Sequence, residues 1–565
     1  MGGNGLSSGL SSAQGAVDDP LRELTVGGAL DLAAAAWGSR TALVEFGSGS
    51  AQRRWTFDEL RLDALRVARA MLERFRPGEH VAVWAANLPE WVLLEMGAAY
   101  AGLTLVTVNP AYQVGELTHV LGQSRCSGAI VQDTYRGRDL VPVVDEARPR
   151  LPALRDVIAL SGWDGFLASG DPSRELPSVE PGDTAQIQYT SGTTGTPKGA
   201  ELTHRGLVNV ARYYAMVNGT GPDDVWVNPM PMFHTAGCGL ATLGALQTGG
   251  THVLPPAFDA SVMLDAVESE RGTVTLSVPT MLIRMLDEQS ARPRNVSSWR
   301  LATLGGAPVP PELVRRAQRE LSLMVTIGFG QTEASPYITH TLPDDPNPNW
   351  ITTVGRPLPH CEVRISEPGS AATMPLGEVG EVCARGYGVM KGYFDAPEAT
   401  AAAVDSDGWL HTGDLGSMDD GGYLRIEGRL RDMIIRGGEN IYPREIEDLL
   451  FTHPLVADVS VVGLPDPEMG ELVAAFIRPV PGTCPSVDEL VDFSRRHLAR
   501  YKTPRVWRFL ESFPQTTSGK IQKFVLRENY SAQLSADGAD PADGRAPQPG
   551  GGEPGPMSRE TGVSG

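Results

Sequence analysis

The stretch on which the interpretation of this chain depends is QYTSGTTGTPKGAEL, residues Gln188–Leu202, which combines hydroxyl side chains, glycines and one lysine, Lys198. Residues 184–189, just before it, alternate apolar and polar side chains, which is the period of a strand. After it, Thr203 is placed to cap a helix with an apolar face. The sequence therefore predicts a strand, a flexible polar loop and a helix.

A loop of this composition suits a phosphate group. Glycines let the backbone approach closely and expose N–H donors, hydroxyl groups add donors, and lysine adds positive charge. It is not a Walker A loop, because Pro197 rather than glycine stands five positions after Gly192. A solvated surface turn is the alternative, but the density of these residues favours a phosphate site. The expected phosphate-binding residues are Thr190, Ser191, Gly192, Thr193, Thr194, Gly195 and Lys198.

Composition bounds the class of protein. The chain has 565 residues, of which 41% are hydrophobic and 21% charged, as in ordinary globular proteins with several domains. Its formal net charge of −20 argues against general binding to nucleic acid or to an anionic membrane. The five cysteines show no C-x-x-C spacing, which argues against a zinc site and favours a reducing cytoplasm. No signal-peptide pattern is present and Glu95 interrupts the longest apolar run, so we expect no transmembrane segment.

Changes in composition and in hydrophobic pattern along the chain predict two domains and two terminal tails. Residues 1–19 and 531–565 are rich in Gly, Ser, Ala, Pro and Asp, which predicts disorder. Helical and strand patterns alternate over residues 20–430, as in a large α/β domain with mostly parallel strands. A stretch rich in Gly and charge follows, and residues 431–530 predict a small α+β domain.

Five motifs occur in the order known from one family: the polar loop, GFGQTE, TGD, GRLRD and TTSGK. With them, residues 22–530 resemble the adenylate-forming (AMP-binding) superfamily, most of all bacterial acyl-CoA synthetases and fatty-acid–CoA ligases. The resemblance implies an α/β fold: a large multi-layer N-terminal domain of the acyl-CoA synthetase type and a small mobile α+β C-terminal domain. It implies an acid–thiol ligase that joins a carboxylic acid to AMP from ATP, releases pyrophosphate, and then transfers the acyl group to coenzyme A.

The resemblance also implies roles at the phosphates. Glu333 would be the magnesium carboxylate, Thr332 a donor to the α-phosphate, and Lys520 the lysine that reaches the substrate carboxylate and the α-phosphate during adenylation. A Mg²⁺ ion held by one carboxylate and by substrate phosphates is normal for this metal. The implied cofactors are therefore ATP, Mg²⁺ and coenzyme A as co-substrate.

For the AMP moiety, the resemblance implies that Asp414 accepts from the ribose hydroxyls and that Arg429 is its donor partner. Arg431 stands at the family's hinge position, where relatives usually carry Lys or Asp, so its effect on hinge energetics is open. Gly437 and Gly438 would line a channel for pantetheine, with a plain turn as the alternative. The residues expected around the adenine are Gly306, Ala307, Pro308, Gly328, Phe329, Gly330 and Gln331.

His234 resembles an aromatic gate beside the substrate carboxylate, although a packed histidine is the alternative. No acidic residue lies between Met232 and Leu246 to pair with an amino-acid ammonium, which favours a medium- or long-chain fatty acid or another bulky apolar acid. Loading of a separate carrier protein, or only one half-reaction, remain alternatives. The expected partners are the acid, ATP and coenzyme A, with no nucleic acid; a homodimer is left open.

Overall fold

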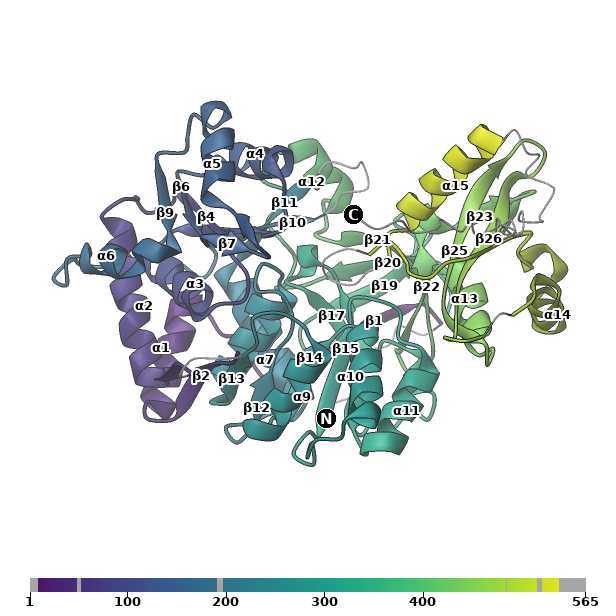
Figure 1. The fold of residues 1–565 in the computed structure, drawn as a ribbon, viewed down its shortest axis with the longest axis horizontal. Coiled ribbons are helices and arrows are strands. Elements are labelled where there is room, and N and C mark those ends of the chain that lie inside the picture. Colours follow the sequence, from purple (N-terminus) through teal and green to yellow (C-terminus); the bar gives the residue numbers. More distant parts are fainter. Residues whose placement is uncertain (1–8, 48–51, 191–196, 484, 516–520, 538–565) are drawn as a thin grey trace, which may run out of the picture. The chain divides into compact units, whose positions relative to one another are not determined.

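The computed structural model describes residues 9–47, 52–190, 197–483, 485–515 and 521–537, with the backbone alone for 531–537 (Figure 1). The chain divides after Arg431 into two compact units. Unit 1 comprises the described residues up to Arg431 together with Gln515, and unit 2 comprises residues 432–514 and 521–537. Both units mix helices and strands, so the predicted α/β class with a large N-terminal and a small C-terminal part is confirmed.

One sheet of unit 1 has the strand order β11-β10-β5-β4-β6-β9 and is parallel except for the antiparallel pair β10–β11. Its strands are β4 (His80–Trp84), β5 (Thr104–Val108), β6 (Gly128–Val131), β9 (Asp156–Ala159), β10 (Thr184–Thr190) and β11 (Lys198–Thr203). The strands β4, β5 and β6 are almost entirely buried, which explains their continuous apolar runs.

The strand predicted over residues 184–189 is therefore confirmed as β10, but the polar loop does not lead directly into a helix. Residues 198–203 form β11, which pairs antiparallel with β10, so the loop connects a β-hairpin. The sequence interpretation missed β11 because this segment is short and mixes polar and apolar residues. It is a strand because it pairs with β10. The helix follows as α7 (His204–Val217), and Thr203 Oγ1 caps it by accepting from Gly206 N, as predicted.

A second sheet of unit 1 has the order β18-β17-β16-β15-β14-β12-β13-β2-β3. It is parallel from β16 to β2, with antiparallel pairs at both edges. Its strands are β2 (Thr41–Glu45), β3 (Arg54–Thr56), β12 (Val225–Val227), β13 (Thr251–Leu254), β14 (Val274–Ser277), β15 (Leu301–Gly305), β16 (Met324–Gly330), β17 (Tyr337–His340) and β18 (Arg356–Pro357).

A third, antiparallel sheet of unit 1 follows the order β1-β19-β20-β21-β22. Its strands are β1 (Ser12–Gln14), β19 (Glu362–Ser366), β20 (Gly380–Arg385), β21 (Leu410–Met418) and β22 (Leu424–Arg429); β7 (Thr134–Tyr135) and β8 (Arg138–Asp139) form a separate small hairpin. The predicted disorder of residues 1–19 is wrong for residues 12–14. Their small and polar side chains gave no strand pattern, but their backbone pairs with β19. Residues 1–8 lie outside the described residues.

Helices of unit 1 flank these sheets (Figure 1), and α1, α2 and α3 pack together, with α3 against β5 of the first sheet and α2 against β2 and β3 of the second. In α2 the Thr56 and Glu59 side chains form a capping box, which explains why the helix begins at Phe57. The α-helices are α1 (Val26–Trp37), α2 (Phe57–Leu72), α3 (Pro89–Ala101), α4 (Val114–Gln123), α5 (Val141–Ala147), α6 (Trp163–Ala168), α7, α8 (Leu243–Thr248), α9 (Ala260–Ser269), α10 (Pro279–Ala291), α11 (Pro311–Leu321) and α12 (Pro397–Ala403). Shorter helices are η1 (Arg148–Arg150), η2 (Leu160–Gly162), η3 (Ala236–Thr242), η4 (Thr332–Ala334), η5 (Trp350–Thr352) and η6 (Leu430–Asp432).

Unit 2 packs its helices against a mixed sheet with the order β24-β23-β26-β25, in which β27 also pairs with β26. Its elements are β23 (Ile434–Arg436), β24 (Glu439–Ile441), α13 (Pro443–Phe451), β25 (Val456–Asp466), β26 (Gly470–Pro479), α14 (Val487–His497), η7 (Arg500–Lys502), β27 (Val506–Phe509) and α15 (Lys523–Asp537). The helix α14 is capped at its N-terminus, because Ser486 Oγ accepts from Glu489 N. The tail predicted from residue 531 is wrong for residues 531–537, whose backbone continues α15; residues 538–565 lie outside the described residues.

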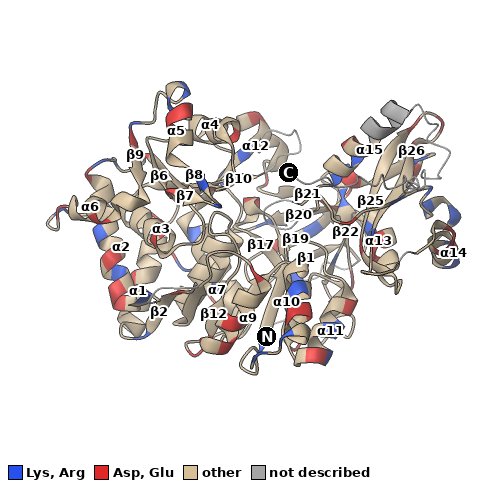
Figure 2. Cartoon of the chain, viewed as in Figure 1, with Lys and Arg blue, Asp and Glu red and all other residues tan. Residues whose placement is uncertain are grey.

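Charged side chains gather on surface helices such as α2 and α11, while β14 and β15 carry almost none (Figure 2). This separation is the expected one for a parallel sheet covered on its faces. Within the described residues, no helix combines the length and apolar character that crossing a membrane requires.

Candidate active site

The end of β10 meets the short helix η4 of the GFGQTE motif. Glu333 is buried, with 7% of its surface exposed, and its Oε1 accepts a hydrogen bond of 3.3 Å from Thr190 Oγ1. These residues lie 143 positions apart in the chain. The structure thus brings together the first residue of the predicted phosphate loop and the predicted magnesium carboxylate. Thr332 is buried beside Glu333.

A second hydrogen bond reaches the same carboxylate oxygen. Tyr393 Oη donates to Glu333 Oε1 over 2.7 Å, and Lys198 Nζ lies 5.2 Å from the centre of the Tyr393 ring. One aromatic side chain therefore contacts the lysine of the polar loop and the acid of η4. The backbone also contributes, since Met390 N donates to Glu333 O over 2.8 Å. Tyr393 was not among the residues expected from the sequence.

The two segments expected to line the adenine follow neighbouring parallel strands. Gly305, at the end of β15, is in register with Gly328 of β16, so both segments start at the same edge of the sheet. A Cβ atom on Gly305 would lie 2.4 Å from Tyr337 Oη, and one on Gly328 would lie 2.5 Å from Tyr337 Cζ. Glycine is required at both positions because the buried Tyr337 ring occupies that space.

Around this edge, Phe329 and Gln331 are half-buried, and Gly306 has a positive φ of 73° that favours glycine. A Cβ on Gly330 would collide with the carbonyl of Pro336 at 1.9 Å. Ala307 and Pro308 continue from β15 with part of their surface exposed. The structure therefore brings these predicted residues to one edge of the sheet.

Asp414 and Arg429 face each other on paired strands. They are register partners between β21 and β22, and Arg429 Nε lies 3.1 Å from Asp414 Oδ1. The Asp414 side chain is 7% exposed and that of Arg429 46% exposed. The predicted carboxylate and its predicted donor partner are thus in contact.

A β-bulge presents Asp414. In the pairing of β20 with β21, Glu381 is opposite Leu415 and Cys383 is opposite His411, so residues 412–414 bulge out. Thr412 Oγ1 donates to Val382 O over 2.7 Å and thereby ties the bulge to β20. Bulges near functional sites re-aim side chains in this way.

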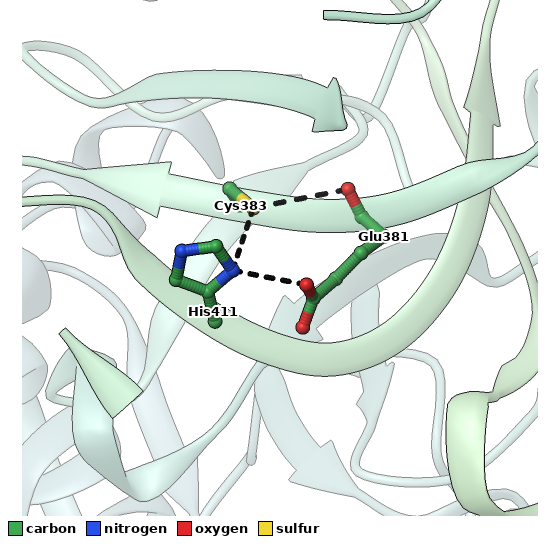
Figure 3. A group of neighbouring side chains, drawn as sticks. All are labelled: Glu381, Cys383 and His411. Carbon is green, nitrogen blue, oxygen red and sulfur yellow. Dashed lines mark hydrogen bonds and ion pairs between the residues drawn. The ribbon is translucent and has the colours of Figure 1, made fainter. Parts of the chain in front are cut away.

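The carboxylate of Glu381 fills this bulge (Figure 3). Its Oε1 accepts from Gly413 N over 3.2 Å, and its Oε2 lies 2.9 Å from His411 Nδ1. Cys383 Sγ lies 3.5 Å from the same nitrogen, so the three residues offer ligand types for a transition metal. Burial raises the pKa of the Cys383 thiol to about 11. The hydrogen bonds already engage the carboxylate and the ring, which favours a structural network that supports the bulge.

His234 lies in the turn before η3, a π-helix. Its carbonyl accepts from Gly237 N and Cys238 N, which fixes the start of η3, and its ring is half-buried. The residues of η3 are small or apolar, and those from Gly237 to Thr242 are buried. π-helical turns are frequent at functional sites, but the role expected for His234 stays a prediction.

Behind η3 runs a buried polar chain. Gln186 Nε2 donates to Glu95 Oε1 over 2.7 Å, and Gln188 Nε2 donates to Gln186 Oε1 over 2.7 Å and contacts Cys238 Sγ at 3.3 Å. Burial raises the pKa of Glu95 well above its usual range, which favours the neutral form of this acid. An acidic side chain therefore does lie near η3, but its burial disfavours the charge that would pair with an ammonium group.

Two family models match most of the chain. Residues 30–394 match the AMP-binding enzyme family, and residues 445–520 match the AMP-binding enzyme C-terminal domain. The first match alone spans more than half of the chain. The chain belongs to the AMP-binding enzyme family. It is an AMP-forming acid–thiol ligase of the acyl-CoA synthetase type, because its relatives are acyl-CoA synthetases and ligases.

This AMP-binding enzyme is 40% identical over 533 residues to YngI of Bacillus subtilis (strain 168), to which acyl-CoA synthetase activity is provisionally assigned. That match covers 89% of this chain and 96% of YngI. The present chain is also 35% identical to the human mitochondrial medium-chain acyl-CoA ligase ACSF2, over 93% of this chain and 91% of ACSF2. Among solved structures, ATP-bound MatB from Rhodopseudomonas palustris superposes with a TM-score of 0.81 at 28% identity, over 89% of this chain and 99% of MatB.

The remaining expected residues of this AMP-binding enzyme lie in the polar loop, near the C-terminus and in unit 2. Ser191, Gly192, Thr193, Thr194, Gly195 and Lys520 lie outside the described residues. In unit 2, Gly437 and Gly438 form the turn between β23 and β24, with φ values of 59° and 86°. Such a two-residue hairpin needs positive φ at both central positions, so the turn by itself accounts for both glycines. Their expected contact with pantetheine stays a prediction.

The sequence interpretation missed Tyr393, Glu381, His411 and Glu95. Tyr393 and Glu381 carry no local signal, because each acts on a residue that is distant in the chain or across a strand pair. His411 directly precedes the TGD motif and could have been found from that position. Glu95 was recognised only as a break in an apolar run, although an acid inside a buried helix is itself a reason to look for a partner.

Proposed function

We propose that this enzyme activates a carboxylic acid with an uncharged, bulky apolar acyl tail as its acyl-AMP and then passes the acyl group to coenzyme A. The observation that carries the proposal is that the β10–β11 hairpin, on which Thr190 and Lys198 are paired, meets η4. Thr190 donates to Glu333, and the Tyr393 side chain contacts both Glu333 and Lys198. A cation, a hydroxyl donor and a buried carboxylate are the groups that a metal-bound triphosphate requires.

In the first step, an oxygen of the substrate carboxylate attacks the α-phosphorus of ATP, and the bond to pyrophosphate breaks. Lys198 and the polar loop bind the leaving phosphates, while Thr332 donates to the α-phosphate. Asp414, supported by Arg429, orients the ribose. In the second step, the thiol of coenzyme A attacks the acyl carbonyl, loses its proton and displaces AMP.

The residues present fit a magnesium ion. Glu333 is a buried oxygen donor, and its hydrogen bonds from Thr190 and Tyr393 both end on Oε1. Mg²⁺ accepts one carboxylate together with phosphate oxygens and water. Glu333 would hold the ion, which supplies positive charge to the phosphates when bound.

The nature of the acyl group follows from the wall behind His234. The buried segment from Gly237 to Thr242 offers no charge, and burial disfavours charge on the nearby Glu95. The human relative is named for medium-chain acids. A relative from Rhodococcus jostii (strain RHA1), 37% identical over 89% of this chain and 98% of the relative, is named for a methyl-dioxo-octahydroindenyl propanoyl group. Both names agree with an apolar acid of more than a few carbons.

ATP–pyrophosphate exchange with a panel of acids tests this function, each acid measured with and without coenzyme A. We expect exchange and thioester formation with medium-chain and bulky ring acids, and neither with amino acids. Exchange without thioester would instead indicate loading of a carrier protein. Thioester formed only from supplied acyl-AMP would indicate an enzyme with a single half-reaction.

Lys520 gives a second test, independent of the described residues. We propose that it neutralises charge on the acid and the α-phosphate only during adenylation. Lys520→Ala should then lower adenylation by at least about 10²-fold. Preformed acyl-AMP should still react with coenzyme A. Equal loss of both steps would contradict this assignment, and the neighbouring Lys523→Ala serves as the control.

A further inference from the structure

The segment from Lys391 to Phe394 lies along β11 like an additional short strand. Lys391 N donates to Glu201 O over 3.0 Å, Glu201 N to Gly392 O over 2.9 Å, and Phe394 N to Gly199 O over 2.8 Å. On the other side, Tyr393 N donates to Thr400 Oγ1 over 2.8 Å. Hydrogen bonds therefore fix the backbone around Tyr393 on two sides, and this fixes the position from which its side chain extends.

The side chain of Tyr393 contacts both charges of the candidate phosphate site. Its hydroxyl donates to Glu333 Oε1 over 2.7 Å, and Lys198 Nζ lies 5.2 Å from its ring centre, within the range of a cation–π contact. A phenol with the ordinary tyrosine pKa of about 10 is protonated at neutral pH, so the hydroxyl serves as a donor to the carboxylate.

We propose that Tyr393 is a positioning residue that presets Glu333 and Lys198 for a magnesium-bound triphosphate. The proposal rests on the function proposed above for Glu333. A glutamate side chain has several rotamers, and holding it in one before the ligand arrives removes that entropy cost from binding. The hydroxyl orients the carboxylate through Oε1, while the ring face supports the lysine. One side chain thus couples the two groups that must act on the same ligand.

The chain offers a closely matched control in Tyr423. Its hydroxyl donates to Asp345 Oδ1 over 2.5 Å, and Arg356 Cζ lies 5.2 Å from its ring centre. This is the same combination of a phenol–carboxylate hydrogen bond and a cation over the ring. Tyr423→Phe should therefore cost stability in the way that Tyr393→Phe does, without changing Glu333.

The test is calorimetric binding of ATP, with Mg²⁺ and with EDTA, to the whole chain. For Tyr393→Phe we expect about tenfold weaker binding of Mg·ATP, since a hydrogen bond to a charged group is lost, and unchanged binding of ATP in EDTA. Tyr423→Phe should bind Mg·ATP like the wild type. Tyr393→Leu, which also removes the ring beneath Lys198, should weaken binding of ATP in EDTA as well.

The variants Glu333→Gln and Glu333→Gln/Tyr393→Phe separate the two proposals. If Tyr393 acts through Glu333, the double variant binds Mg·ATP no more weakly than Glu333→Gln alone. Equal binding by Tyr393→Phe and wild type, with Glu333→Gln impaired, would overturn the role of Tyr393 only. Wild-type binding by Glu333→Gln would overturn the proposed function of Glu333 itself.

Discussion

The candidate site has two sides that are built in different ways. The phosphate side joins the paired residues Thr190 and Lys198 of the β10–β11 hairpin to Glu333 and Tyr393, so it combines three separate segments of unit 1. The ribose side is a cross-strand pair, Asp414 and Arg429, only 15 residues apart on β21 and β22. The first depends on how whole elements pack, whereas the second depends mainly on the register of one hairpin and on a bulge beside it.

This difference in construction parallels a difference in chemistry. Pyrophosphate leaves after the first half-reaction, so groups that bind only the outer phosphates can affect only that step. AMP stays bound until the thiol attacks, so groups that bind its ribose can affect both steps. Substitutions on the two sides should therefore give distinguishable kinetic patterns.

The largest effect is expected from Glu333→Gln on the phosphate side. Loss of the buried charge should lower the rate of adenylation by about 10³-fold, because preorganised charge at the phosphates is removed. The rate of thioester formation from supplied acyl-AMP should stay unchanged. Single-turnover assays of each half-reaction measure this. Glu201→Gln, on the adjacent strand β11, is the control, and a comparable loss in both half-reactions would break the proposed separation.

On the ribose side, Asp414→Asn should weaken both half-reactions by about 30-fold, since charge-assisted hydrogen bonds to the ribose are lost. The effect should be seen as raised KM values for ATP and for acyl-AMP. Asp420→Asn, at the exposed turn of the same hairpin, should have no effect. If Asp414→Asn slowed adenylation alone, the assignment of Asp414 to the ribose would be wrong.

A smaller effect is expected from Glu381→Gln, which removes the charge beside His411 and weakens support of the bulge. We expect about a fivefold higher KM for ATP and for acyl-AMP with kcat nearly unchanged, because the loss of one hydrogen bond is transmitted only through Asp414. Glu362→Gln on the neighbouring strand β19, whose carboxylate pairs with Arg385, is the matched control. A fall in kcat with unchanged KM would contradict a positioning role.

The smallest effect on activity, but a clear one on stability, is expected from Glu95→Gln. The folded-state pKa of Glu95 is raised, so unfolding releases a proton above the unfolded pKa of about 4.3 and wild-type stability falls as pH rises. Glutamine mimics the neutral acid and cannot ionise. The free energy of unfolding of the variant, relative to wild type, should therefore rise from pH 5 toward pH 8 by up to about 1.4 kcal/mol per pH unit. Denaturant unfolding at several pH values measures this difference; a constant difference would contradict a buried neutral Glu95.

Several elements could be predicted from sequence because their determinants are local. The caps at Thr203 and Ser486 and the alternating run of β10 depend on residues a few positions apart. The strands β1 and β11 could not be predicted in this way, because each is defined by its pairing with another strand. The same distinction applies to the site, where motif residues were identified but their supports were missed.

By itself, the sequence determined the class of fold, because alternating helix and strand patterns depend on short-range periodicity. The order of its motifs determined the family, and the resemblance to that family predicts which charged and hydroxyl groups meet the phosphates and the ribose. Only the tertiary structure decided that Tyr393 bonds to Glu333, that a bulge supported by Glu381 presents Asp414, and that burial raises the pKa of Glu95. The physical reason is that hydrogen-bond partners and desolvation are set by segments that meet only after folding, and no local pattern encodes which side chains will face each other.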